Sequence, residues 1–268
     1  MNSKWDCHAH VFGPFENYPL AAGRSYSPNE ARLEDYLSLL ASLNLQHGVL
    51  VHPSAYGQSF ELLLDCLERE KSLRGVIVIN PSTEIDLQEL RGKGIRAARF
   101  SARSGASTNF FGSASFEDYQ SLRTQLRDAG LHAELWTDCK MLPLIEQELL
   151  ASPVDVVIDH MGGFDVNLGV NDPGFQCLLR LMDSGKIWLK LCAYRNLLQD
   201  ATMDRGRAFH EKLLQANPDR LVWGTDWPHL NVSPPPHTST LLETVSKWTQ
   251  DDTVLTKILS SNPQQLYQ

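Results

Sequence analysis

The amino-acid sequence predicts one α/β domain that spans residues 1–268 and folds as a distorted (β/α)8 TIM barrel. Short β-rich runs alternate with helical patterns along nearly the whole chain, which is typical of parallel strands joined by helices. The length of 268 residues is close to the ~250 residues of such a barrel. The turn after the first predicted strand is His-Ala-His-Val-Phe-Gly-Pro, whereas an open doubly wound sheet would carry a Gly-rich phosphate turn there.

The first half of the chain supplies four strands and their helices. Residues 27–30, Ser-Pro-Asn-Glu, have the pattern of a capping box with proline at the first helical position, and they predict a helix over 29–43. Apolar residues at helical spacing predict the next helix over 60–70, and a shorter one around Leu87 and Leu90. The four predicted strands are 5–12, 47–53, 75–81 and 95–101.

The second half of the chain repeats this plan. A Gly/Ser-rich connection from Ser101 to Ser115 precedes a predicted helix over 116–129, and a loop of this length is more often functional than idle. The last predicted strand starts at Leu221 and ends on Asp226, because Pro228 cannot continue the ladder. The other strands are predicted over 132–136, 154–160 and 187–192, and the closing helices over 239–247 and 253–259.

Composition excludes several classes of function. The net charge of −8 comes from 32 acidic against 24 basic residues, and no basic run is long enough to follow a phosphate backbone, so nucleic acid is not an expected partner. The N-terminus has no apolar signal core and no run approaches the ~20 apolar residues of a membrane span. The odd number of cysteines, 5, fits reduced thiols in the cytoplasm. The sequence is silent on oligomeric state.

Ionisable side chains gather at the predicted ends of the strands. In a (β/α)8 barrel the chemistry lies at the carboxyl ends of the strands, so residues from distant parts of the chain meet there. Period-two alternation places Asp6, His8 and His10 on one face of the first strand. Convergence of several ionisable groups on one barrel mouth favours a site over isolated structural roles. The other strand-end candidates are His52, Ser54, Tyr56, Arg99, Trp136, His160, Arg195 and Asp226.

Three motifs in order resemble the amidohydrolase superfamily, in particular its branch of 2-pyrone-4,6-dicarboxylate lactonases. They are Asp-Cys-His-Ala-His-Val-Phe-Gly-Pro from Asp6, Ile-Asp-His-Met-Gly from Ile158, and Trp-Gly-Thr-Asp-Trp-Pro-His from Trp223. The His-x-His pair alone is weak evidence, but the three motifs at the first, sixth and eighth strands are specific. The resemblance extends to the closing Leu266 and Tyr267 and so covers nearly the whole chain.

The resemblance implies a metal-independent lactone hydrolase. It makes Asp226 the general base that activates water, and it gives His8, His10 and His160 the task of binding the lactone carbonyl and handling protons. Ester hydrolysis requires these parts in any case: a base beside the water, and fixed donors where oxyanion charge develops.

The expected partner is a small anionic lactone, whose carboxylate needs cations in a partly dry site. The resemblance assigns this task to Arg99 and Arg195, with Tyr26 and Ser54 as hydrogen-bond donors. For Arg99, a structural salt bridge under the long loop is the alternative interpretation.

The sequence departs from these lactonases around the substrate. Gly105 stands where they carry a second arginine, so that either Arg103 reaches the same carboxylate or the substrate has one carboxylate fewer. Trp136 replaces a tyrosine at the end of the fifth strand, and Tyr56 replaces a histidine in the loop after the second strand. Both are therefore expected to contact the substrate. The reaction type is better specified by the sequence than the identity of the lactone.

No cofactor is expected. Metal-bearing relatives complete their site with a histidine at the end of the fifth strand, whereas His132 lies at the opposite end, ~13 Å away at 3.3 Å per residue. A single Zn2+ or other divalent ion remains an alternative, with His8, His10 and Asp226 as three ligands.

Other functions stay open at this point. A lactone isomerase of the same branch would use the same histidines and aspartate, and a zinc-dependent decarboxylase or amidohydrolase would contain stoichiometric metal. A barrel that binds a sugar acid or an aromatic acid without turnover is the alternative from another class.

Overall fold

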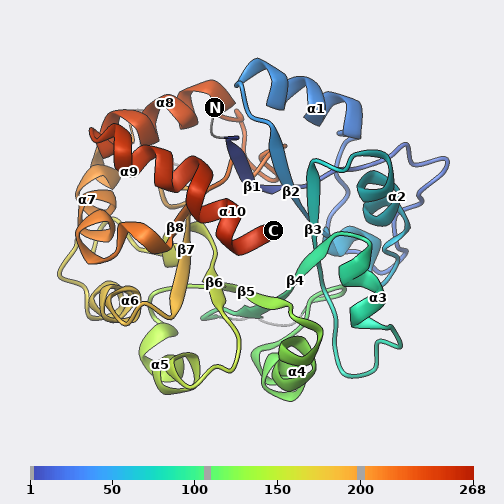
Figure 1. Ribbon diagram of the computed structural model, residues 1–268, viewed down its shortest axis with the longest axis horizontal. Helices are drawn as coiled ribbons and strands as arrows, with labels where there is room; N and C mark the ends of the chain where they lie inside the picture. The colour runs from blue at the N-terminus through green and yellow to red at the C-terminus, as the bar shows by residue number, and fades with distance from the viewer. Residues whose placement is uncertain (1–2, 106–109, 198–202) are drawn as a thin grey trace.

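Eight parallel strands form a nearly closed barrel surrounded by helices, which confirms the predicted fold class (Figure 1). The computed structural model describes residues 3–105, 110–197 and 203–268. Part of the long connection predicted over 101–115, residues 106–109, lies outside this description. Each strand pairs with the next one in the chain, in the order β1-β2-β3-β4-β5-β6-β7-β8.

The elements follow the predicted alternation. The strands are β1 (Trp5–Ala9), β2 (His47–Val51), β3 (Leu73–Ile77), β4 (Ile95–Ala102), β5 (His132–Thr137), β6 (Val156–Ile158), β7 (Ile187–Leu191) and β8 (Leu221–Trp223). The helices are α1 (Leu33–Ser42), α2 (Glu61–Arg69), α3 (Leu87–Gly92), α4 (Phe116–Ala129), α5 (Leu142–Leu150), α6 (Pro173–Asp183), α7 (Arg207–Ala216), α8 (Thr238–Thr249), α9 (Asp252–Thr256) and α10 (Asn262–Tyr267).

The barrel closes between β1 and the segment that follows β8. The Asp226 amide donates to the His8 carbonyl and the His10 amide to the Trp227 carbonyl, each over 2.8 Å. Gly224 permits this approach, because a Cβ atom there would lie 2.7 Å from the Cβ of His8. Residues at opposite ends of the sequence are thereby held side by side, and the base candidate Asp226 lies beside both histidines of β1.

The predicted single face for Asp6, His8 and His10 is wrong. The pairing of β1 with β2 shifts register between Asp6 and Ala9, and such a bulge reverses the direction of the side chains that follow. The Asp6 carboxylate instead accepts hydrogen bonds from the Tyr36 hydroxyl of α1 and from the Thr225 amide and hydroxyl. Asp6 thus fastens β1 to the end of β8 and does not join the histidines.

The predicted start of the first helix at residue 29 is also wrong, because α1 begins at Leu33. Phe12 and Ala31 exchange two backbone hydrogen bonds of 2.8 and 3.0 Å, which hold the segment before α1 extended. The Glu30 carboxylate, expected to cap the helix, accepts instead from the Phe15 amide. Asp35 supplies the cap by accepting from the Arg32 amide.

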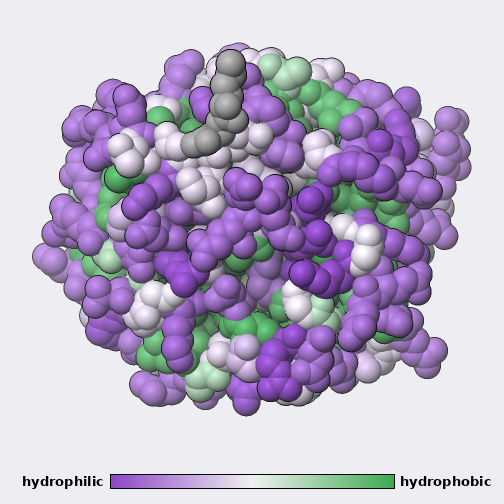
Figure 2. Space-filling model, viewed as in Figure 1, coloured by the Kyte–Doolittle hydropathy of each residue, from purple (hydrophilic) through white to green (hydrophobic). Residues whose placement is uncertain are grey.

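The barrel interior has an apolar floor with a polar layer above it. Trp5, Trp188 and Tyr267 belong to the fully or nearly fully buried cluster that forms this floor. Helix α10 lies across this end of the barrel, with the C-terminus near its centre (Figure 1). Mostly hydrophilic side chains cover that face (Figure 2). The site is therefore expected at the opposite end, where the strands finish.

Two further sequence expectations concern cysteines and membranes. All five cysteines are buried, and none forms a disulfide. Among the described helices, none has both the length and the apolar character that crossing a bilayer requires.

Acid is expected to destabilise the fold through buried neutral histidines. His52, at the end of β2, is 2% exposed and shares a 2.9 Å hydrogen bond with the Gly57 carbonyl. Burial lowers the pKa of His52 from 6.5 to about 4. The unfolded chain therefore takes up a proton below pH 6.5 that the folded chain refuses until about pH 4. Its contribution to stability is complete above pH 6.5 and is lost as pH falls through this window.

The variant His52→Gln tests this linkage, because its amide can keep the bond to Gly57. Between pH 6 and 4.5, the pH dependence of its unfolding free energy is expected to be shallower than the parent's by up to ~1.4 kcal/mol per pH unit. Urea titrations at several pH values measure the slope. Equal slopes in parent and variant would show that His52 titrates alike in the folded and unfolded chains.

Candidate active site

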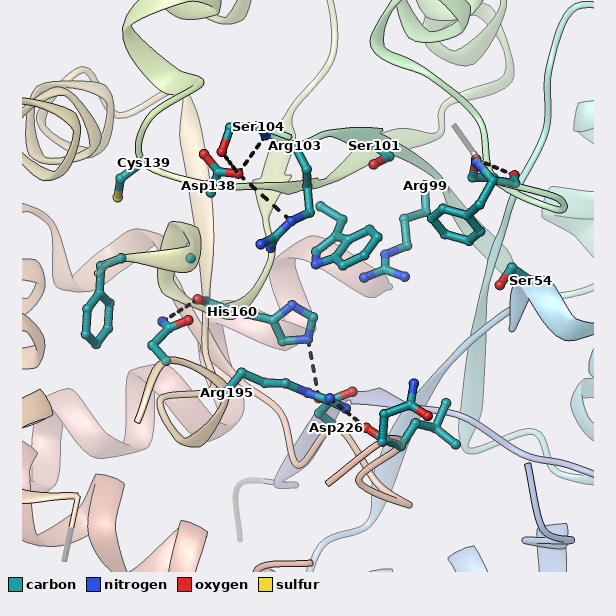
Figure 3. A pocket seen from close by; sticks show the side chains of 18 of the residues that line it. Ser54, Arg99, Ser101, Arg103, Ser104, Asp138, Cys139, His160, Arg195 and Asp226 are labelled. Carbon is teal, nitrogen blue, oxygen red and sulfur yellow. Dashed lines mark hydrogen bonds and ion pairs between the residues drawn. The ribbon is translucent and has the colours of Figure 1, made fainter. Parts of the chain in front are cut away.

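A cavity of about 870 Å³ opens at the carboxyl ends of the strands and contains most of the predicted site residues. Its volume falls in the ordinary range for small-molecule sites. The side chains of Arg99, Arg103 and His160 point into the same central space, with Asp226 and Arg195 across from them (Figure 3). The walls of the cavity thus contain the predicted general base, predicted catalytic histidines and several positive charges.

Three imidazole rings surround the carboxylate of Asp226. The Nε2 atoms of His8 and His10 lie 3.8 and 3.6 Å from Oδ1, and Nε2 of His160 lies 3.6 Å from Oδ2. These separations are longer than a direct hydrogen bond. The oxygen atom of a water molecule or a substrate could, however, contact an imidazole nitrogen and the Asp226 carboxylate at the same time. The rings also touch each other, with centroids of His8 and His160 4.9 Å apart. The prediction that β1, β6 and β8 bring these four residues together is met by the geometry, although His8 is fully buried and is not among the described residues that line the cavity.

The backbone presents Asp226 and His160 in an uncommon conformation. Their φ angles are 57° and 48°, in the left-handed region that non-glycine residues seldom adopt. His160 comes two residues after the end of β6, and Asp226 three residues after the end of β8. Local strain of this kind persists where surrounding structure enforces it, and it often marks a functional position.

The second oxygen of Asp226 is occupied by donors from the segment after β7. The Tyr194 hydroxyl donates to Oδ2 over 2.8 Å, and Arg195 Nε donates to the same oxygen. Burial would raise the pKa of Asp226, but His160 and Arg195 outweigh it and hold that pKa well below the usual value. Asp226 is therefore ionised at neutral pH. Its Oδ1, on the side of His8 and His10, remains available to a water molecule.

Arg195 has a different arrangement from the one predicted. It lines the cavity, but its Nε pairs with Asp226 and its NH1 donates to the Leu230 carbonyl over 2.7 Å. Its first role in this structure is to hold the carboxylate in place. Sequence reasoning missed Tyr194, which shares that task with Arg195.

A buried charge network lies directly beneath the histidines. Lys190 of β7 and Glu134 of β5, both fully buried, form an ion pair of 2.5 Å, and Lys190 Nζ lies 3.3 Å from Asp159 Oδ1. Lys190 Nζ also donates to His8 Nδ1 over 3.3 Å. Although burial opposes its charge, Asp159 and Glu134 raise the pKa of Lys190. Burial and this ammonium group lower the pKa of His8 to about 3, so its ring is neutral.

Sequence reasoning missed this network. The available signal was a charged residue in the middle of an otherwise apolar strand, Lys190 within Ile187–Leu191 and Glu134 within His132–Thr137. Such residues are almost never fully buried without a partner. Asp159 belongs to the motif that starts at Ile158, but the sequence assigned it no role in the site.

Two arginines and a tryptophan form the cationic wall of the cavity. The Trp136 ring faces both guanidinium groups, with Arg99 5.7 Å and Arg103 4.9 Å from its centroid. Arg99 Nε donates to Asp159 over 2.7 Å, which is the salt bridge that the sequence left as an alternative, yet Arg99 also lines the cavity. Asp138 lies 3.9 Å from Arg103. Asp159 thus orients Arg99, Asp138 lies beside Arg103, and the Trp136 indole contacts both arginines.

Tyr26 and Ser54 line the cavity as predicted, whereas Tyr56 does not. The side chains of Tyr26 and Ser54 both carry a hydroxyl group that could donate to a bound molecule. Tyr56 is 4% exposed, and its hydroxyl accepts from the Gly13 amide over 2.8 Å. It is absent from the described residues that line the cavity. The predicted contact of Tyr56 with the substrate is therefore wrong, because the short turn Ser54–Tyr56 directs its ring into the core.

Among the described residues, three groups have metal-ligating atoms within 4.8 Å of one another. His8, His10 and Asp226 form the group predicted from sequence, and His160, Cys192 and Asp226 form another. The third contains His8, Glu134 and Asp159, the same side chains that surround the Lys190 ammonium.

Comparisons with known proteins agree with this architecture. The family model described as Amidohydrolase matches residues 5–268. A 4-sulfomuconolactone hydrolase from Rhizobium radiobacter is 31% identical over 98% of this chain and 89% of its own. A D-galactarolactone isomerase from Agrobacterium fabrum is 26% identical over 98% of this chain and 90% of its own.

A crystal structure from Acinetobacter baumannii, described as a probable 2-pyrone-4,6-dicarboxylic acid hydrolase with citric acid bound, has a TM-score of 0.82 and 26% identity. It covers 100% of this chain, which covers 99% of it. The resemblance seen in the three sequence motifs is confirmed.

Proposed function

The chain belongs to the amidohydrolase family, and we propose that it hydrolyses a small anionic lactone by an aspartate-activated water, without a metal ion. The observation that carries this proposal is the position of Asp226. Its free Oδ1 lies within 4 Å of two histidine Nε2 atoms, in a cavity whose opposite wall carries Arg99 and Arg103. Relatives named as hydrolases of lactones support the same reaction type.

The reaction follows from these positions. Water donates a proton to Asp226 Oδ1 as its oxygen attacks the lactone carbonyl carbon, and histidine N–H groups stabilise the oxyanion. The tetrahedral intermediate then collapses, the ring C–O bond breaks, and the leaving oxygen takes the proton back from Asp226. Tyr194 and Arg195 keep the carboxylate oriented through both steps.

The anionic substituent of the lactone binds the cationic wall. Arg99 and Arg103 are partly exposed to the cavity and are held apart by Trp136. Guanidinium groups suit both carboxylates and sulfonates, since each offers two coplanar acceptor oxygens to the fork. Ser54 and Tyr26 add hydroxyl donors at the same end.

The geometry around His8 supports metal independence. A histidine that ligates a metal normally donates its second ring N–H to a carboxylate, carbonyl or water. Beside that nitrogen, His8 has the Lys190 ammonium, which is a donor, at 3.3 Å and the Asp159 carboxylate, which is an acceptor, at 3.4 Å. The group His8–Glu134–Asp159 already encloses this cation. The cation beside His8 therefore weighs against a catalytic metal held by His8, His10 and Asp226, and no step above uses one.

A panel of lactones tests the proposal. Metal-free protein is expected to hydrolyse 2-pyrone-4,6-dicarboxylate or a sulfonated muconolactone, with consumption of base, and to leave an uncharged lactone of the same ring size nearly untouched. Mass spectrometry of the product separates the main alternative, since hydrolysis adds the mass of one water and isomerisation adds none. The galactarolactone isomerase relative favours that alternative. A product of unchanged mass, or no turnover of any anionic lactone, would reject hydrolysis.

Replacing Arg103 with Met is expected to weaken substrate binding more than chemistry. A charge-assisted hydrogen bond contributes about 1.5 kcal/mol or more, so KM should rise about tenfold or more while kcat changes little. Steady-state kinetics with the best anionic lactone measures both. Arg127→Met, which removes an exposed arginine paired with Asp128, is the control. A fall in kcat alone would place Arg103 at the reacting centre.

A further inference from the structure

Lys190 occupies the position from which it controls the proton on His8. Its side chain is fully buried inside the barrel, and its Nζ contacts Glu134 Oε2, Asp159 Oδ1 and His8 Nδ1 at 2.5, 3.3 and 3.3 Å. Glu134 and Asp159 lie beside this positive charge, and Arg99 supplies the second positive charge, so the burial of the ammonium is electrostatically supported. The contact between Lys190 and His8 is not needed to neutralise the ammonium. We therefore look for a role of this contact in the reaction.

The contact fixes the form of the His8 ring. Its Nδ1 has two neighbours, the Lys190 ammonium at 3.3 Å and Asp159 Oδ1 at 3.4 Å. An ammonium group has only donors, so the shorter contact makes His8 Nδ1 an acceptor. The neutral ring then carries its proton on Nε2, which is buried, has no hydrogen-bond partner, and lies 3.8 Å from Asp226 Oδ1. A buried donor without a partner is rare in a native structure. It is explained if the donor is reserved for a substrate oxygen.

The neighbouring histidine of β1 is fixed in the opposite form. His10 Nδ1 lies 2.8 Å from the Val51 carbonyl, which can only accept, so Nδ1 carries the proton. In the neutral ring, Nε2 is then an acceptor, and it lies 3.6 Å from Asp226 Oδ1. Two acceptors at this separation can each receive one hydrogen of the same water molecule.

We propose that Lys190 and the Val51 carbonyl set opposite tautomers on His8 and His10, so that the two rings divide the reaction between them. His8 Nε2–H holds the lactone carbonyl oxygen as negative charge develops. His10 Nε2, together with Asp226 Oδ1, holds the attacking water, whose proton passes to Asp226. Lys190 is a positioning residue in this scheme, since it touches neither substrate nor water. The assignment of reaction steps rests on the proposed lactone hydrolysis, but the two tautomers do not.

The network connects this end of the site to the cationic wall. Asp159 contacts Lys190 through Oδ1 and accepts from Arg99 Nε through Oδ2. The ammonium that sets the donor for the carbonyl thus also neutralises the acid that orients an arginine for the anionic substituent. Residues of β4 and β7 and the residue after β6 thus fix the group that orients His8 and the arginine for the anionic substituent relative to each other.

Nitrogen NMR of the histidine side chains tests the tautomers without any substrate. In metal-free protein labelled with ¹⁵N-histidine, His8 is expected to show a bare Nδ1 and a protonated Nε2, and His10 the reverse. The variants His8→Gln and His10→Gln assign the signals by their loss. A protonated Nδ1 on His8 would overturn the proposal, because the ring would then donate to Asp159.

The variant Lys190→Met tests the consequence for catalysis. Without the ammonium, His8 is expected to move its proton to Nδ1, toward Asp159, and to present an acceptor to the carbonyl. The kcat should then fall about 100-fold, as for loss of an oxyanion donor, with KM within about threefold of the parent. Lys186→Met, on the exposed lysine just before β7, is the control and should behave like the parent.

A second variant keeps the test decisive if Lys190→Met does not fold. Lys190→Met combined with Glu134→Gln removes one buried charge of each sign and leaves the pair of Asp159 with Arg99. It should show the same tautomer change on His8 and the same kinetic split. Unchanged His8 signals or unchanged kcat in a folded variant would reject the role of Lys190. Parent protein that shows both tautomers but hydrolyses no lactone would reject the proposed function alone.

Discussion

Asp226→Asn is expected to lower kcat by about 10²–10⁴-fold, because the variant cannot accept the proton of the attacking water. Asparagine keeps the shape of the side chain and a carbonyl oxygen for the donors Tyr194 and Arg195. Binding of the ring-opened product should therefore survive. Stopped or single-turnover assays measure the chemical step, and calorimetry with the product measures binding.

The control for Asp226→Asn is an acid in the same cavity that lies away from the reacting centre. Asp165 lines the cavity and accepts from the Asn167 amide, so Asp165→Asn should leave kcat near the parent's. An Asp226→Asn protein that turns over like the parent would show that another group activates water. If neither protein turned over any lactone while both bound its product, the barrel would be a binding module.

Glu134→Gln is expected to cost about 3–5 kcal/mol of unfolding free energy, because it leaves the buried ammonium of Lys190 with half of its counter-charge. Glutamine preserves the volume, and its carbonyl can still accept the 2.8 Å hydrogen bond from the Tyr267 hydroxyl. The loss therefore reports the missing charge and not a cavity. Urea unfolding followed by tryptophan fluorescence measures it.

A surface ion pair supplies the matched control for Glu134→Gln. Glu146 pairs with Arg180 over 2.9 Å, but the Arg180 side chain is 58% exposed, so water screens the interaction. Glu146→Gln is expected to change stability by less than about 1 kcal/mol. Equal effects of the two substitutions would mean that the interior of this barrel solvates Lys190 as well as water does.

The sequence predicted the parts of the fold that depend on pattern. Alternating apolar runs and helical spacing located all eight strands, and the position of Asp226 at the end of the last run placed it at the barrel mouth. Boundaries were less predictable where tertiary contacts override local signals. The start of α1 is the example, since the pairing of Phe12 with Ala31 extends a segment with a helix-capping pattern.

The candidate site was predicted in outline but not in its pairings. His8, His10, His160 and Asp226 meet because strand ends converge, which topology alone dictates. Which face a side chain takes after a bulge, as for Asp6 and His8, cannot be derived from period-two alternation. Nor does spacing show that Arg195 pairs with Asp226, or that Tyr56 turns into the core. These outcomes depend on contacts between segments far apart in the chain.

The buried network was the largest omission, and its signal was present. A lysine and a glutamate in two apolar strands of a closed barrel have no solvent to reach and must find each other. Once the strands are assigned, Lys190 and Glu134 both point into the barrel, and their pairing follows. The placement of Lys190 beside His8 required the register of all eight strands.

The measurement that tests the central claim most directly is the rate of lactone hydrolysis against bound metal. Protein is stripped with a chelator, its zinc and manganese contents are determined, and hydrolysis of 2-pyrone-4,6-dicarboxylate and of a sulfonated muconolactone is followed before and after metal is added back. The account predicts full turnover by metal-free protein, unchanged by added Zn2+ or Mn2+. Activity that is absent from stripped protein and returns in proportion to bound metal would contradict it.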